Sequence, residues 1–161
     1  MSTLTVWKFD TPQGAQEALH KLIDLSKQHL IQVNDAAIVS WEAGKKKPKT
    51  QNYGSLTGQG ALSGAFWGML FGLLFFVPLF GMAVGAAMGA LSGKFADYGI
   101  NDKFIKEVRE QVTEGTSALF LMTSDAVQDR VAEAFQGVSV ELIQSNLTSE
   151  QEAQLTEDFG G

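Results

Sequence analysis

Residues 60–93 read GALSGAFWGMLFGLLFFVPLFGMAVGAAMGALSG, and this apolar stretch divides the chain into two kinds of sequence. It belongs to a longer run, residues 50–93, that contains no Asp, Glu, Lys or Arg. All charged residues of the 161-residue chain lie in 1–49 and 94–161, where charge is as frequent as in ordinary globular domains. We therefore expect one domain assembled from 1–49 and 94–161, with 50–93 inserted as a hydrophobic element.

Glycine recurs at every fourth position in two parts of this stretch. A glycine in the interior of a water-exposed helix costs about 1 kcal/mol relative to alanine, so the pattern is unfavourable for an isolated soluble helix. In membranes the same spacing lets helix backbones approach closely. The residues that we expect to mediate helix packing and oligomerisation are Gly60, Gly64, Gly68, Gly72, Gly81, Gly85, Gly89 and Gly93.

Pro78 interrupts the apolar stretch, and we expect it to break a helix there, because its ring removes a backbone donor and disfavours helical geometry at the preceding residue. Two arms remain, residues 60–77 and 79–96. Each arm would be about 27 Å long as a helix, close to the ~30 Å of hydrocarbon in a bilayer. The sequence therefore predicts a hydrophobic helical hairpin.

Basic residues stand at both ends of the predicted hairpin, and basic flanks are typical of the cytoplasmic side of a membrane. Both flanking segments are therefore expected in the cytoplasm, and the absence of Cys agrees with a reducing compartment. Lysines near an anionic membrane surface attract its headgroups. The lysines that we expect to contact lipid headgroups are Lys45, Lys46, Lys47 and Lys49.

The flanks contain two similar strand–helix–strand units. Alternating or continuous apolar residues predict strands at 4–9, 36–41, 118–122 and 138–142, and helical periodicity predicts helices at 12–29 and 102–113. The helix at 12–29 is opened by Asp10 or Thr11, and a further helix, capped by Ser124 and Asp125 and ended by Gly137, completes the second unit. The helix at 102–113 lies outside both units. This order predicts an α+β, ferredoxin-like βαβ-βαβ domain, with a four-stranded antiparallel sheet and two helices on one face. A doubly wound parallel sheet is the alternative, and no glycine-rich turn supports it.

Three stretches carry a family resemblance: Ala-Ile-Val at 37–39, LFGLLFFVPLFG at 70–81 and GALSGKFADYGINDKFIK at 89–106. With the lysine-rich link they resemble an uncharacterised bacterial family whose members are labelled predicted membrane proteins. The resemblance covers most of the chain. It implies a bacterial origin and the inner membrane as location, and it supplies no activity and no catalytic residues.

The charge and the residue inventory limit the function classes. A net charge of −6 argues against nucleic-acid binding, and two histidines (His20 and His29) without Cys offer no evident metal or cofactor site. We expect no catalytic residue and no enzyme activity. The preferred function is a homo-oligomeric, membrane-associated protein with a structural or membrane-organising role, whose partners are itself and lipid. The alternatives are a soluble particle or filament that buries the hairpins, and a pore lined by the glycine stripes.

Overall fold

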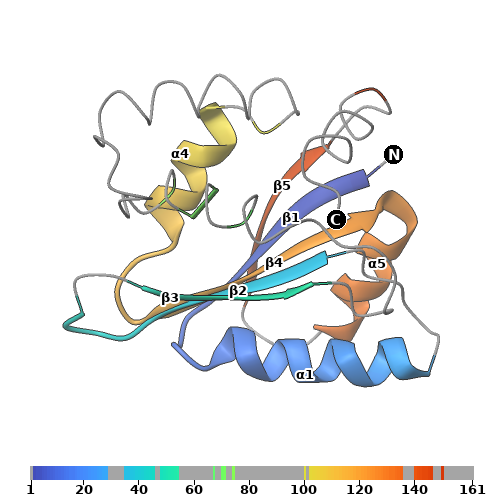
Figure 1. Cartoon of the computed structure of the whole chain (residues 1–161), viewed down its shortest axis with the longest axis horizontal. Helices are drawn as coiled ribbons and strands as arrows, with labels where there is room; N and C mark the ends of the chain where they lie inside the picture. Colours follow the sequence, from blue (N-terminus) through green and yellow to red (C-terminus); the bar gives the residue numbers. More distant parts are fainter. Residues whose placement is uncertain are drawn as a thin grey trace.

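The computed structural model describes residues 2–28, 35–45, 48–54, 67, 70, 71, 74, 100, 102–135, 140–146 and 150. Within these residues, five strands form one antiparallel sheet in the order β3-β2-β4-β1-β5 (Figure 1). The strands are β1 (Ser2–Phe9), β2 (Asp35–Trp41), β3 (Lys49–Gly54), β4 (Thr116–Ser124) and β5 (Val140–Asn146). The helices are α1 (Gly14–Lys27), α4 (Asp102–Gln111) and α5 (Asp125–Ala134).

Both faces of the sheet are apolar and both are covered. Successive residues of a strand point to opposite faces of the sheet. Leu4 and Val6 of β1 therefore face one side, and Trp7 and Phe9 face the other side. Trp7 and Phe9 pack with α1 and α5, which lie together on one face (Figure 1). The opposite face is covered by α4. This two-sided burial explains why residues 118–122 of β4, Ala-Leu-Phe-Leu-Met, form an unbroken apolar run.

The predicted ferredoxin-like fold with an inserted hairpin is wrong, although the protein is α+β. The sheet has five strands rather than four, because residues 49–54 form β3 instead of a link into the hydrophobic segment. The helices lie on both faces of the sheet rather than on one. The described part of the chain shows no long apolar helical hairpin, and none of its helices is long and apolar enough to cross a membrane. The doubly wound alternative is also wrong, because every pairing between the described strands is antiparallel.

The start of α1 is fixed from β4 rather than by the predicted caps. The helix begins at Gly14, and Ser117 of β4 accepts a hydrogen bond from the Ala15 backbone N–H (2.9 Å). The same hydroxyl donates to the Thr11 carbonyl (2.6 Å). A glycine is required at position 14 by close approach, since a Cβ there would lie 2.6 Å from the Cβ of Phe9. Ser117, which is distant from α1 in the sequence, therefore takes the place of the local N-cap side chain that usually accepts this kind of hydrogen bond.

Replacing Ser117 with alanine tests this link between β4 and α1. Ser117 is fully buried, so Ser117→Ala removes the acceptor of the Ala15 N–H and leaves the Thr11 carbonyl with the longer hydrogen bond from the Gly14 N–H (3.3 Å). We expect the free energy of unfolding, measured by urea denaturation, to fall by about 1–3 kcal/mol. Gln13→Ala is the control, because the Gln13 side chain at the N-cap makes no capping hydrogen bond. The control should change the value by less than about 0.5 kcal/mol, and equal losses in the two variants would contradict the assignment.

Candidate functional site

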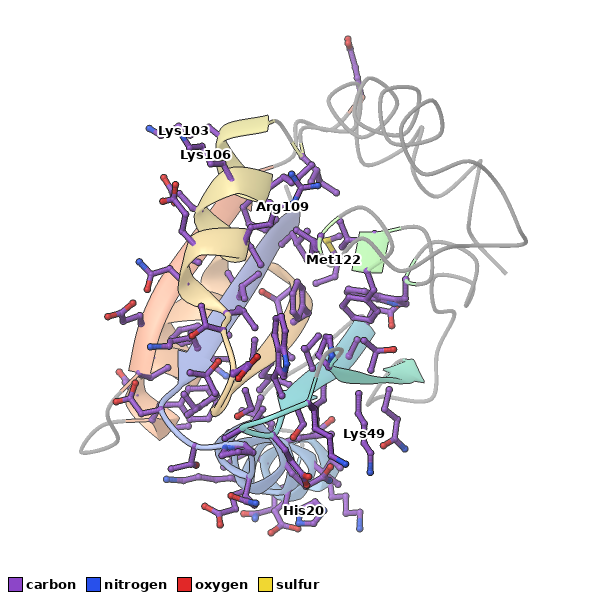
Figure 2. All side chains as sticks on the ribbon, turned by 90° about the vertical axis from the view of Figure 1, so that its left-hand side faces the viewer. His20, Lys49, Lys103, Lys106, Arg109 and Met122 are labelled. Carbon is purple, nitrogen blue, oxygen red and sulfur yellow. The ribbon has the colours of Figure 1, made fainter. Side chains whose placement is uncertain are left out.

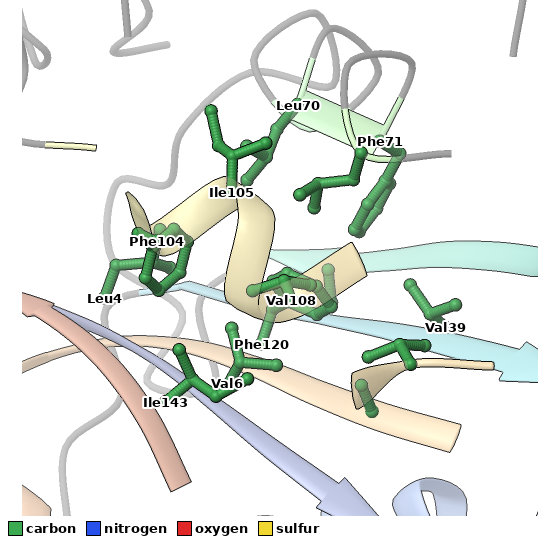
Figure 3. Packing of buried hydrophobic residues seen from close by; sticks show 14 of the residues in the cluster. Leu4, Val6, Val39, Leu70, Phe71, Phe104, Ile105, Val108, Phe120 and Ile143 are labelled. Carbon is green, nitrogen blue, oxygen red and sulfur yellow. The ribbon is translucent and has the colours of Figure 1, made fainter. Parts of the chain in front are cut away.

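The uncharged segment enters the core of the domain through four side chains. Trp67, Leu70, Phe71 and Leu74 are helical, follow the i, i+3, i+4, i+7 spacing of one helix face, and are each at most 5% exposed. They belong to the same core cluster as Leu4, Val6, Val39 and Phe120 of the sheet (Figure 3). We call these four residues the anchor, because they attach the uncharged segment to the face of the sheet that α4 also covers.

Three aromatic rings form the centre of this contact. The rings of Trp67 and Phe71 stack with their centroids 5.8 Å apart. Both meet the ring of Phe120 edge-on, at 6.2 Å from Trp67 and 5.2 Å from Phe71. Edge-to-face aromatic pairs contribute about 0.5–1.5 kcal/mol beyond the burial of their area. The contact is therefore specific as well as hydrophobic, and it joins residues about fifty positions apart in the chain.

Helix α4 closes the other side of the anchor. Its Phe104, Ile105 and Val108 belong to the same cluster, and Figure 3 shows Ile105 beside Leu70. Arg109 at the far end of the helix is half-buried, and its Nε donates a hydrogen bond to the backbone carbonyl of Leu74 (3.2 Å). The guanidinium thus holds a backbone group at the last described residue of the anchor. A charge-assisted hydrogen bond of this kind is stronger than a neutral one.

Most of the residues that the sequence analysis assigned to helix packing lie outside the described residues. This holds for all eight glycines of the two stripes, for Pro78, and for Lys46 and Lys47. Lys45 and Lys49 are described, and both side chains are exposed. The Lys45 carbonyl accepts a hydrogen bond from the Trp41 indole N–H (2.9 Å), and Lys49 begins β3 opposite Ser40 of β2. Lys45 therefore follows the turn at residues 43–44, and Lys49 opens the edge strand β3.

The sequence contains a pattern that could have predicted the anchor. The glycine spacing predicted that this segment packs on neighbouring helices. Four bulky residues between the glycines also satisfy the spacing of an amphipathic helix that packs on a sheet: Trp67, Leu70, Phe71 and Leu74. Phe120 and Arg109 were not identified as partners, because periodicity within one segment carries no information on what a distant segment contacts.

Away from the anchor, the described residues include an exposed histidine and a surface cleft. No group of three or more His, Asp and Glu side chains in this part of the chain is placed to hold a metal ion. The exposed His20 lies with its Nε2 3.1 Å from the Gln16 side-chain nitrogen. A surface cleft of about 320 Å³ lies beside the start of α1, between Phe9, Gly14 and Phe135. Glu17 and Lys21 also line this cleft.

Comparison with known proteins gives a family and no activity. Residues 61–160 match the model of a family described as "Protein of unknown function (DUF1269)". No curated protein and no solved structure matches the chain. The matched range contains the anchor, α4, β4, α5 and β5, whereas β1 and β2, which supply Leu4, Val6 and Val39 to the same core cluster, precede it.

Shortening one anchor side chain tests whether the segment packs on the sheet. Leu70 is fully buried, and Leu70→Ala should lower the free energy of unfolding by about 2–5 kcal/mol, because it removes apolar contacts and leaves a cavity. The matched control is Leu142→Ala, whose side chain on β5 is 42% exposed and should lose about 1 kcal/mol or less. Urea unfolding of the full chain in mild detergent, followed by circular dichroism, measures both. Equal losses would contradict the packing of the anchor.

Proposed function

We propose that this protein, which belongs to that family of proteins of unknown function, is a non-enzymatic, homo-oligomeric, membrane-associated protein with a structural role in organising the membrane. One observation carries the proposal. A run of 44 residues without charge, 50–93, is attached by a buried anchor to a charged folded domain. The domain then serves as a rigid holder, and the residues beyond the anchor associate with lipid and with other copies.

The residues that follow the anchor are the ones available for membrane association. Residues 75–91 read FFVPLFGMAVGAAMGAL and contain no charged side chain and no Ser, Thr, Asn or Gln. Soluble monomers seldom expose large apolar patches, and burial of apolar area contributes roughly 25 cal/mol per Å². These residues therefore need a cover, which lipid supplies. Four of the glycines at fourfold spacing, beginning at Gly81, allow close contact between copies.

The sheet supports a location of both flanks on one side of the membrane. Strand β1 from the first flank pairs with β4 and β5 from the second, and β2 pairs with β4. Two flanks that share one sheet fold in one compartment. Together with the basic residues near the uncharged segment, this favours the cytoplasmic face of a bacterial inner membrane.

The second candidate is a soluble particle or filament in which copies bury one another's apolar segments. The anchor favours it, because the one described part of residues 60–93 packs on protein. A pore is less well supported, since Ser63 and Ser92 are the sole hydroxyl side chains in that stretch to line a polar path.

Vesicle flotation separates these candidates. We expect the full chain to rise with phospholipid vesicles in a density gradient and to stay with them after alkaline carbonate extraction. A variant in which a short flexible linker replaces residues 75–93 keeps the anchor, and it should remain folded and no longer float. A wider deletion of 58–93 removes four core side chains and should destabilise the domain, against the expectation from sequence that the flanks fold alone.

Measurements of particle mass and of bound lipid distinguish the membrane proposal from the soluble assembly. A full chain that forms large particles without bound lipid, and that does not float, would contradict the membrane proposal and favour the soluble assembly. Flotation of the 75–93 variant to the same extent as the full chain would show that another part of the protein binds the membrane.

A further inference from the structure

The cleft beside the start of α1 is large enough to hold a small molecule. Its volume of about 320 Å³ lies at the lower end of the range that is usual for ligand pockets. The cleft is distant from the anchor, because α1 and α4 cover opposite faces of the sheet, and Figure 2 shows His20 of α1 far from Lys103 of α4. Binding in this cleft therefore does not depend on the membrane association proposed above.

The apolar part of the lining comes from the end of β1, the first turns of α1 and the residue that follows α5. It consists of Phe9, Gly14, Ala18 and Phe135. The rings of Phe9 and Phe135 meet edge-to-face with their centroids 5.8 Å apart, and each residue is 3% exposed. Because both rings are held in the core, this part of the cleft is preformed and suits an apolar group of a ligand.

Three charged side chains line the same cleft: Asp10, Glu17 and Lys21. The Nζ of Lys8 lies 3.1 Å from Asp10, which offsets the charge of this carboxylate. Glu17 and Lys21 are exposed and lie one helical turn apart, a spacing at which opposite charges commonly pair. In the described part of the chain, however, neither of the two takes part in an ion pair. The cleft therefore offers one carboxylate and one ammonium group to a ligand.

We propose that this cleft binds a free α-amino acid with an apolar side chain. The side chain of the ligand packs against Phe9 and Phe135, its ammonium group faces Glu17, and its carboxylate faces Lys21. One carbon atom carries both charged groups of an α-amino acid, and the Cβ atoms of residues one helical turn apart are about 5–6 Å from each other. The two flexible side chains can therefore reach both groups of one ligand. A molecule that carries a single charge leaves either Glu17 or Lys21 without a partner.

Three probes separate the contributions of the two charges. L-phenylalanine carries both charges, 3-phenylpropionate lacks the ammonium group, and phenethylamine lacks the carboxylate. Each probe is titrated into the full chain in mild detergent, and binding is followed by the NMR signal of the Trp7 indole N–H. This signal reports on the cleft, because the ring of Trp7 meets the ring of Phe135 with the centroids 5.3 Å apart.

Two variants and two matched controls assign the binding to the cleft. The variants are Glu17→Gln and Lys21→Gln, and each removes one charge from the lining. The controls are Asp24→Asn and Lys27→Gln, which remove the same charges from exposed positions of α1 outside the lining. Circular dichroism checks that all four proteins are folded.

We expect L-phenylalanine to bind saturably and more tightly than either analogue. Glu17→Gln should weaken the binding of L-phenylalanine and phenethylamine by up to roughly fivefold, as for an exposed ion pair, and should not weaken that of 3-phenylpropionate. Lys21→Gln should weaken the binding of L-phenylalanine and 3-phenylpropionate, and should not weaken that of phenethylamine. The proposal is overturned if no probe gives a saturable shift, if all three bind equally, or if the controls lose as much affinity as the variants. None of these results bears on membrane association, which vesicle flotation tests separately.

Discussion

The sheet of this protein has two apolar faces, and each needs a cover that excludes water. On one face α1 and α5 provide it, packing on Trp7, Phe9 and neighbouring strands. On the other face α4 shares the cover with the anchor, whose Trp67 and Phe71 rings meet the ring of Phe120 on the central strand β4. The fold thus depends on a contact between the uncharged segment and the charged domain. For this reason the anchor residues of the segment are part of the core of the domain.

Sequence periodicity identified the helices and strands whose own spacing of apolar residues marks the side that they bury. The strand at 4–9 and the helices at 12–29 and 102–113 correspond to β1, α1 and α4. Periodicity failed where an element is held in place by contacts with another part of the chain. Residues 49–54, Lys-Thr-Gln-Asn-Tyr-Gly, show no apolar alternation, because β3 is an edge strand held by the backbone of β2. The start of α1 depends on Ser117, which no local cap pattern reveals.

The unusual composition of the candidate site could be predicted from the sequence, but its packing on the sheet could not. The absence of charge over 50–93 marked the segment as exceptional, but its bulky residues fitted two partners equally well, a glycine-striped neighbouring helix or an apolar sheet. The sheet was overlooked because the ferredoxin-like prediction placed both helices on one face and gave the other face no cover. An apolar strand such as 118–122 is buried on both sides, and this signal could have identified the missing layer. The anchor gives the proposed function its physical basis, since a rigid domain can hold an apolar segment at a fixed place.

The coupling between Phe71 and Phe120 tests this account most directly. Their ring centroids lie 5.2 Å apart at 85°, and one ring comes from the uncharged segment while the other comes from β4. A double-mutant cycle with Phe71→Leu, Phe120→Leu and the combined variant, measured by urea unfolding in mild detergent, isolates their interaction. We predict that the two losses of stability are not additive, with a coupling energy of about 0.5–1.5 kcal/mol. Losses that add to within about 0.3 kcal/mol would show that the rings act independently, and would contradict the packing of the anchor on the sheet.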